Sequence, residues 1–399
     1  MARTGIMKRK PLIRQRMEWI IMEQFLNSRQ TEMLGLLEQL VNIDSGSRNK
    51  AGIDKVGSIL KEAYVNLGFD VQTVSQEIQG DHLIIRHNDA KDPEILIVAH
   101  MDTVFRDGTA AERPFSVKDG RAFGPGVIDM KASLVSLLYA VQAIADSGRP
   151  GLDNIEILLT SDEEIGSITS RPMIEAHAEG KKAALIMEPA RKDGSLVSAR
   201  KGGGDYTIRV HGVAAHSGIE PEKGRSATEE LAHKIIKLHA LTDYNEGITV
   251  NVGIIQGGDA VNVVTPEAVG YVDIRTTKLS QAEPLDRKIR EICAVPDVEG
   301  TNITVEGAID RPPMERTEGT ARLIERIREI GAEIGIGVTD TATGGGGDAS
   351  YTSAAGIPTI DGMGPIGGNA HREDEYLEID SFVPRCRLLA ETIVSLSEQ

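Results

Sequence analysis

Residues 95–102 read ILIVAHMD, an apolar run that ends in a histidine, a methionine and an aspartate. A continuous apolar run of this length is typical of a strand buried on both faces of a sheet, because a strand with one solvated face alternates apolar and polar residues. Polar residues that follow such a strand lie at its carboxyl end, where open α/β sheets form binding sites. The sequence therefore predicts a central strand with candidate site residues His100 and Asp102 after it.

The segments on both sides of this strand extend it into an α/β fold. Helices are expected at residues 11–26, 30–41 and 52–66, strands at 70–75, 82–87, 94–99, 155–159 and 183–187, and further helices at 130–145 and 171–178. This alternation indicates a central, mostly parallel sheet flanked by helices. A helix at 317–334, a strand at 358–361 and a last helix at 381–396 are expected to continue the same domain.

The pattern changes after Pro189, where strands outnumber helices. Strands are expected at residues 196–199, 205–211, 248–255, 268–276 and 301–309, with helices at 226–241 and 282–293. This order predicts a small α+β domain inserted into the first one. The expected division is a catalytic domain at 1–195 and 311–399 and a lid or dimerisation domain at 196–310, whose exposed helices and edge strand suit pairing with a second copy.

Length and charge limit the possible partners. A chain of 399 residues exceeds the roughly 250–300 residues that one hydrophobic core usually supports, which also favours two domains. Lys and Arg number 44 against 60 Asp and Glu, which gives a net charge of -16. Such a charge repels phosphate backbones and anionic lipid surfaces, so neither nucleic acid nor a membrane is an expected partner.

Three further features favour a soluble, cytoplasmic protein. Cys293 and Cys386 are too few for a disulfide framework, which fits a reducing compartment. The longest uncharged apolar stretch, residues 132–145, is too short to cross a bilayer. The basic N-terminus resembles the start of a signal peptide, but Glu18 and Glu23 interrupt the apolar block after it, so we interpret this segment as an amphipathic surface helix.

Side chains that can bind a metal recur in five separate segments, most of them at strand ends. They are His100 with Asp102, Asp129, Asp162-Glu163-Glu164, Glu188, and His371. Each segment taken singly has an ordinary structural explanation, such as a hydrogen-bonded loop histidine or a solvated acidic triplet. Three adjacent carboxylates after an apolar strand repel one another, however, and a bound dication would let them lie together. Imidazole and carboxylate are the ligands that zinc, manganese or cobalt accept where no thiolate is offered.

Seven segments together resemble one enzyme family. In chain order they are AHMDTV, GPGVIDMKAS, TSDEEIGS, IMEPA, AAHSG, GGDAVNVVTPEAVGYVDIR, and GGDASY followed by NAHREDEY. The chain resembles, over about residues 34–395, the dinuclear zinc metallopeptidases that include glutamate carboxypeptidase, succinyl-diaminopimelate desuccinylase, aminoacylase and several dipeptidases. The resemblance implies a zinc-exopeptidase-like fold for the first domain.

The resemblance also implies a set of metal ligands. His100, Glu188 and Asp129 would hold one ion, Glu164, His371 and Asp129 would hold the other, and Asp129 would bridge the two. The ions would be zinc, with cobalt or manganese as alternatives, and they would share a hydroxide that serves as the nucleophile at neutral pH.

Residues beside the ligands acquire roles from the same resemblance. Glu163 would be the general base, and Asp102 would orient the imidazole of His100. The peptide bond between Asp129 and Met130 is expected to be cis. His216 would stabilise the oxyanion in the partner subunit's site, although without the resemblance it would be an ordinary loop histidine.

Two residues are expected to bind the substrate's α-carboxylate, Arg311 and Asn262. A guanidinium binds a carboxylate bidentately, but Arg311 could equally be a surface residue before two prolines. A glutamate at position 188 resembles the carboxypeptidases, aminoacylases and desuccinylases of the family, whereas the aminopeptidases and dipeptidases tend to have an aspartate at this position. Gly347 and Ser226 depart from the family's usual threonine and asparagine, which leaves the accepted side chain open.

The predicted function is metal-dependent hydrolysis of an amide by a homodimer. The likeness at residues 344–381 is greatest to glutamate carboxypeptidase, so a C-terminal amino acid, with glutamate and aspartate as candidates, would be released from a small peptidyl or acyl substrate. An N-acyl-amino-acid amidohydrolase or a desuccinylase is the alternative enzyme, since it would share every ligand. A dimeric binding protein that has lost its chemistry is the alternative outside enzymes.

Overall fold

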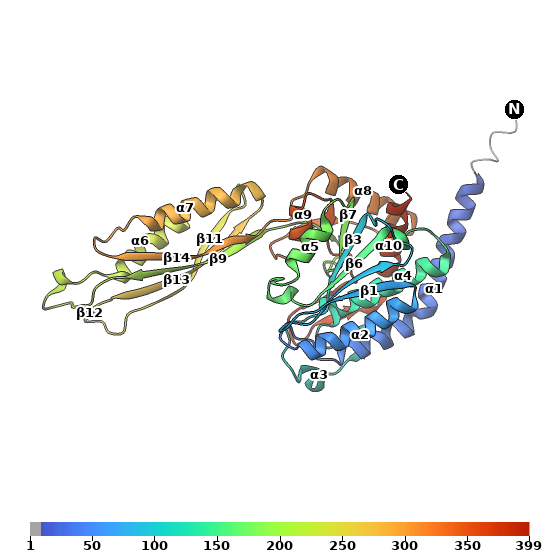
Figure 1. Cartoon of the computed structure of the whole chain (residues 1–399), viewed down its shortest axis with the longest axis horizontal. Helices are drawn as coiled ribbons and strands as arrows, with labels where there is room; N and C mark the ends of the chain where they lie inside the picture. Colours follow the sequence, from blue (N-terminus) through green and yellow to red (C-terminus); the bar gives the residue numbers. More distant parts are fainter. Residues whose placement is uncertain (1–8, 399) are drawn as a thin grey trace, which may run out of the picture. The chain divides into compact units, whose positions relative to one another are not determined.

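Strand β3 (Ile95–His100) lies within a six-stranded sheet, shown in Figure 1. The computed structural model describes residues 9–398, with side chains from residue 21 onward. The strand order is β1 (Phe69–Val74), β2 (His82–His87), β6 (Ile155–Thr160), β3, β7 (Ala183–Ile186) and β16 (Thr359–Ile360). β1–β2 and β2–β6 are antiparallel, whereas β3–β6, β3–β7 and β7–β16 are parallel, so the sheet is mixed and the three strands around the site are parallel.

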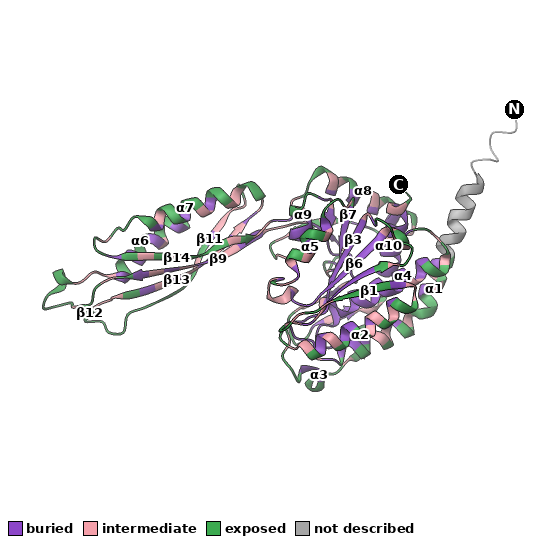
Figure 2. Ribbon diagram, in the orientation of Figure 1, coloured by how far each residue is buried: buried purple, intermediate pink, exposed green. Residues whose placement is uncertain are grey.

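β3 is buried on both faces, as its apolar sequence predicts. Ile95, Ile97 and Ala99 belong to the main core cluster, which also contains most of α4 (Ala132–Ser147). Leu96 and Val98 are fully buried but lie outside that cluster, because successive side chains of a strand point to opposite faces. Figure 2 shows the central strands as the most continuously buried part of this region.

Helices cover the sheet. They are α1 (Arg9–Val41), α2 (Lys50–Asn66), α4, α5 (Arg171–Ala178), α8 (Glu318–Glu333), α9 (Ala349–Ala354) and α10 (Ile379–Ser397), with a short α3 (Thr109–Glu112). α4 packs against α1, α10 and β3, while α9 packs against α5, β7 and β16. The interval Val127–Ser147 is long and apolar enough to span a membrane by length and composition, but most of it is buried inside the protein, as in a core helix.

The N-terminal region differs from the sequence prediction. The two helices expected at residues 11–26 and 30–41 form the single helix α1. Asn27, Ser28 and Arg29 do not end the helix, because Ser28 donates to the carbonyl of Phe25 and Arg29 pairs with Glu32 one turn later. Of the predicted basic amphipathic helix, residues 1–8 lie outside the described residues.

A smaller sheet and a strand pair complete the elements near the site. β17 (Gly367–Gly368), β18 (Tyr376–Glu378), β5 (Arg121–Phe123) and β4 (Ser116–Lys118) form a four-stranded sheet, and β8 (Leu196–Arg200) pairs with β15 (Asp340–Thr343). The chain divides into unit 1, residues 1–198, 316–342 and 347–399, and unit 2, residues 199–315 and 343–346. Each unit has its own hydrophobic core.

Unit 2 is an antiparallel sheet covered by two helices. Its strand order is β11 (Thr249–Gly257), β13 (Glu267–Thr276), β9 (Gly202–His211) and β14 (Asn302–Arg311), with a separate pair of β10 (Ala215–His216) and β12 (Val263–Val264). α6 (Ala227–His239) packs on β9, β11 and β13, and α7 (Ala282–Ala294) packs on β14. Ser226 caps α6 by accepting a hydrogen bond from the backbone N–H of Glu229, which gives this residue a structural role.

Candidate metal centre

The ends of three neighbouring parallel strands deliver four of the predicted site residues. His100 is the last residue of β3, Glu163 and Glu164 begin the short helical turn η3 (Glu163–Ile165) after β6, and Glu188 follows β7. Because β6, β3 and β7 are adjacent and parallel, their carboxyl ends meet at one edge of the sheet. Asp129 comes from η1 (Val127–Lys131), which leads into α4.

Asp129 lies between the two imidazoles. Its Oδ1 is 3.2 Å from Nε2 of His100, and its Oδ2 is 3.1 Å from Nε2 of His371. Each carboxylate oxygen therefore faces a different histidine. The peptide bond from Asp129 to Met130 is cis, as the resemblance implies.

One further carboxylate completes each half of the cluster. Oε1 of Glu188 is 3.7 Å from Nε2 of His100, and Oε2 of Glu164 is 3.2 Å from Nε2 of His371. The structure therefore brings together all five predicted ligands. It also divides them into the two groups that the resemblance implies, with Asp129 common to both.

The donor set fits divalent metal ions. Ligand atoms of His100, Asp129 and Glu164 lie within 4.8 Å of one another, as do those of His100, Glu163 and Glu188. Oε1 of Glu164 is buried and has no hydrogen-bond partner among the described residues, so it is available for a cation. Two imidazoles and several carboxylates, without a thiolate, are ligands that suit zinc, manganese and cobalt.

The electrostatics of the cluster favour cations. Burial would lower the pKa of His100, but hydrogen bonds to Asp102 and Asp129 raise it well above its usual value. Hydrogen bonds to Asp129 and Glu164 raise the pKa of His371 to about 11. The neighbouring carboxylates thus favour the cationic form of both imidazoles when only protein groups surround them. A metal ion that binds Nε2 must displace that proton.

Asp102 connects the ligand His100 to the loop that carries Glu163 and Glu164. Its backbone carbonyl lies 2.9 Å from Nδ1 of His100, and its carboxylate lies 3.4 Å from the same nitrogen. The carboxylate also accepts hydrogen bonds from the backbone N–H groups of Glu163 and Glu164 and from the hydroxyl of Ser47. The carbonyl is thus the nearer partner of the imidazole, and the carboxylate mainly holds the loop.

The acidic triplet does not act as one group. Asp162 accepts hydrogen bonds from the backbone N–H and the hydroxyl of Thr169, and it belongs to neither metal-competent group. Glu163 and Glu164 belong to the metal-competent cluster. The carboxylate of Asp162 therefore closes the loop from Asp162 to Thr169, and the carboxylates of Glu163 and Glu164 belong to the candidate metal centre.

Sequence reasoning missed Glu375, which holds the loop of Asp129. This fully buried residue accepts hydrogen bonds from the backbone N–H groups of Ile128 at 2.8 Å, Asp129 at 3.1 Å and Gly126 at 3.3 Å. Burial raises its pKa to about 8, although these three donors favour the charged form. The only sequence signal was its place in the segment NAHREDEY, four residues after His371.

The remaining predicted residues lie in unit 2. His216 is exposed, its Nδ1 accepts a hydrogen bond from the N–H of Gly218, and the N–H of Ser217 donates to the carbonyl of Asn262. His216 and Asn262 are therefore neighbours. Arg311 is the last residue of β14, opposite Gly203 on β9.

Arg311 and Asn262 lie at opposite ends of the unit 2 sheet. Arg311 pairs with Gly203, whereas the chain reaches β10 and its partner β12 only after β9 ends at His211. The eight residue steps from Gly203 to His211 span about 26 Å at about 3.3 Å per residue. The structure thus brings Asn262 to His216 and does not bring it to Arg311.

Comparisons with known proteins bear on the family and the fold of the chain. A model of peptidase family M20/M25/M40 matches residues 96–395. Carboxypeptidase G2 from Pseudomonas sp. strain RS-16 is 27% identical over 384 residues, which cover 94% of this chain and 92% of that protein. A succinyl-diaminopimelate desuccinylase from Bordetella petrii is 26% identical over 362 residues, covering 85% of this chain and 91% of that protein. The crystal structure of aminopeptidase PepT from Bacillus cereus has a TM-score of 0.79 at 24% identity, and the match covers 92% of this chain and 98% of that one.

Replacement of Glu375 should weaken metal binding. Glu375→Ala removes the acceptor for three N–H groups of the Asp129 loop, and loss of such a supporting contact typically lowers metal affinity about 10-fold to 100-fold. Glu375→Gln keeps one acceptor oxygen and should have an intermediate effect. Competition with a chromogenic chelator measures the affinity. The matched control is Glu373→Gln, an exposed residue of the same loop, and an equal loss in the control would contradict the assigned role.

Metal binding to the metal-free protein should release protons and strengthen as pH rises. His100 and His371 have raised pKa values, so their cationic forms are favoured, and a metal must displace the proton on the nitrogen that it binds. Calorimetric titration with zinc at neutral pH, in two buffers of different ionisation enthalpy, should show a net release of protons as the sites fill. A zinc affinity that does not change with pH would contradict this electrostatic description.

Proposed function

The chain belongs to peptidase family M20/M25/M40, and from this premise we propose that it is a dinuclear metal-dependent carboxypeptidase. Family membership makes the protein a metal-dependent hydrolase. The proposed reaction removes a C-terminal amino acid, with glutamate and aspartate as first candidates, from a small peptidyl or acyl group. The observation that carries the proposal is Asp129, whose two oxygens face two histidines that each have a further carboxylate beside them.

The proposed ligands are His100, Asp129 and Glu188 for one ion and His371, Asp129 and Glu164 for the other. Zinc is the proposed metal, and cobalt or manganese suits the same donors. Two such ions, when bound, would polarise the scissile carbonyl and lower the pKa of the attacking water. The protein's own part is to hold five ligands from separate segments in one place.

Glu163 is the proposed general base. Its carboxylate belongs to the cluster with His100 and Glu188, and its backbone N–H is held by Asp102. In this position it would take the proton of the attacking water and pass it to the leaving amine. The presence of Glu163 together with all five ligands argues against a binding protein without chemistry.

Two related reactions are candidates for this site, and they differ in the substrate that they require. The similarity to carboxypeptidase G2 and the glutamate at position 188 favour release of a C-terminal residue. The similarity to a desuccinylase supports the alternative of an N-acyl-amino-acid amidohydrolase, which would use the same ligands and differ in its acyl pocket. Arg311 and Asn262 are proposed to bind the α-carboxylate that both substrate classes carry.

A cytoplasmic location is part of the same proposal.

We propose a homodimer, and the positions of the two proposed carboxylate contacts support it. Arg311 and Asn262 of one chain lie at opposite ends of the unit 2 sheet, so they cannot bind the same carboxylate. The pair can act together only if one of them comes from a second subunit. We propose that Asn262 and His216, which are neighbours, act across the dimer.

Glu163→Gln should abolish turnover and leave metal binding intact. Loss of a general base typically costs about 100-fold to 10,000-fold in rate. Initial rates with N-acyl amino acids and dipeptides, together with metal content by atomic emission, test this expectation on the zinc-loaded, cobalt-loaded and manganese-loaded enzyme. Glu179→Gln, at an exposed position after α5, is the control. A Glu163→Gln enzyme with wild-type rates would remove the assigned base.

Two inactive variants should restore activity when they are mixed. In a heterodimer of Glu163→Ala and His216→Ala subunits, one site would combine an intact Glu163 with the partner subunit's His216. Random exchange should therefore recover about a quarter of the wild-type activity, because about half of the dimers are mixed and each has one competent site. Each variant passed alone through the same exchange is the control. A mixture that stays as inactive as its components would show that His216 does not act across the dimer.

A further inference from the structure

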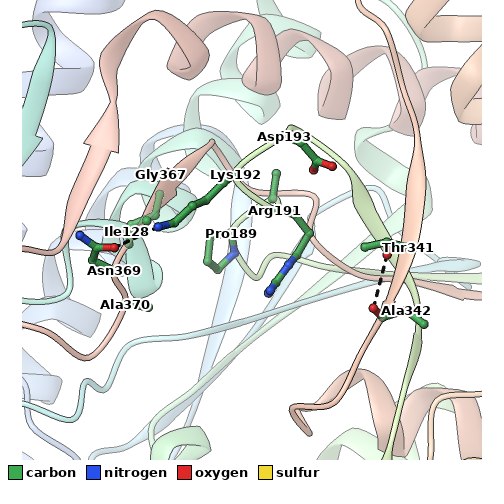
Figure 3. A pocket seen from close by; sticks show the side chains of 12 residues that line it. Ile128, Pro189, Arg191, Lys192, Asp193, Thr341, Ala342, Gly367, Asn369 and Ala370 are labelled. Atoms are coloured by element: carbon green, nitrogen blue, oxygen red, sulfur yellow. Dashed lines mark hydrogen bonds between the residues drawn. The ribbon is translucent and has the colours of Figure 1, made fainter.

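Unit 1 has a hollow of about 610 Å³ beside the candidate metal centre, drawn in Figure 3. Three of its lining residues are direct chain neighbours of proposed ligands: Ile128 precedes Asp129, Pro189 follows Glu188, and Ala370 precedes His371. Its volume lies within the range of about 300–1,000 Å³ that is usual for sites of small molecules. The hollow therefore lies where part of a substrate would extend from the reacting bond.

The wall of this hollow is cationic in a protein of net charge -16. Arg191 and Lys192 line it, and Asp193 is the only acidic lining residue among those described. The carboxylate of Asp193 is engaged by its own loop, because it accepts a hydrogen bond from the N–H of Ser195 at 3.0 Å. Figure 3 shows Arg191 and Lys192 extending from this loop on the side away from Asp193.

Lys192 is held in position by a chain of hydrogen bonds. Its Nζ donates to Oδ1 of Asn369 at 3.0 Å, and Nδ2 of Asn369 donates to Oδ2 of Asp374 at 2.7 Å. The bond to Asp374 fixes the orientation of the amide, so its oxygen faces the lysine. Asn369 has φ 59°, a left-handed conformation that asparagine tolerates better than most residues.

Gly368 leaves the space that the stem of Lys192 occupies. A Cβ at this position would lie 2.7 Å from Cε of Lys192 and 2.8 Å from the hydroxyl of Tyr376. A larger residue would therefore move the lysine away from Asn369. The Asn369 amide and the space at Gly368 together keep one ammonium group at the wall of the hollow. Among the described residues this group makes one hydrogen bond, so two of its three donors are available.

We infer that Arg191 and Lys192 form a subsite that binds a second carboxylate of the substrate, the side-chain carboxylate of a released glutamate or aspartate. This inference rests on the proposed carboxypeptidase function and names residues that select its substrate. Arg191 uses its backbone N–H and carbonyl to close its loop, with Ser195 and Gly194. Its guanidinium is a hollow-lining cation with no hydrogen bond or ion pair to another described side chain, so it can bind a carboxylate oxygen. A charge-assisted contact of this kind favours an acidic side chain over its amide, because the amide presents no charge to the two cations.

The test compares N-benzoyl-glutamate with N-benzoyl-glutamine on the zinc-loaded enzyme. The ratio of kcat/KM for these two substrates should be at least about tenfold in favour of glutamate in the wild-type enzyme. Lys192→Met and Arg191→Met should each reduce this ratio severalfold, chiefly through KM for the acidic substrate, and the double variant should bring it near unity. Lys91→Met is the matched control, since Lys91 is an exposed lysine of unit 1 in the loop before the amino end of β3, and its ratio should equal that of the wild type.

Two negative results would be distinguishable. If neither N-benzoyl amino acid is cleaved with zinc, cobalt or manganese, the proposed function fails and the inference fails with it. If both are cleaved but the ratio is near unity in the wild type, or is the same in the double variant as in the wild type, the subsite is overturned and the proposed function stands.

Discussion

The main constraint on the site is that three carboxylates are buried around two imidazoles. Asp129, Glu164 and Glu188 approach one another at the edge of the sheet, and burial raises the pKa of Glu164 and Glu188 because it disfavours their charged forms. Protons on the two histidines compensate part of this negative charge. Two divalent cations would compensate all of it. Without positive charge nearby, placing these carboxylates together costs free energy. The surrounding fold must therefore hold them in place.

That support comes from hydrogen bonds between loops. The carboxylate of Asp102, after β3, holds the backbone of Glu163 and Glu164, after β6. The carboxylate of Glu375, before β18, holds the backbone around Asp129 in the same way. The sheet thus brings the loops to one edge, and two further buried acids set their positions. This arrangement separates the residues that would bind metal from the residues that place them.

The sequence was informative where function and local structure share one pattern. An apolar strand that ends at His100 predicts a central strand with a candidate site residue at its end, and the structure has this strand with His100 as its last residue. Glu375 could not be found in this way, because its partners are backbone N–H groups 246 to 249 residues away in the chain, which no side-chain pattern records. The separation of Arg311 from Asn262 also escaped the sequence, since it follows from the register of β14 on β9. Lys192 was missed because, in the sequence alone, a lysine in a short loop cannot be told from an ordinary surface lysine.

The charge of the whole protein and the charge of the hollow act over different distances. A net charge of -16 would repel a dicarboxylate substrate, but at physiological ionic strength exposed charges are largely screened beyond about 8 Å. Contacts within hydrogen-bond distance are screened far less, so Arg191 and Lys192 can attract a carboxylate that the protein as a whole does not. Selection for an acidic side chain would then arise after encounter, from local contacts in the hollow. It would depend less on salt than the rate of encounter does.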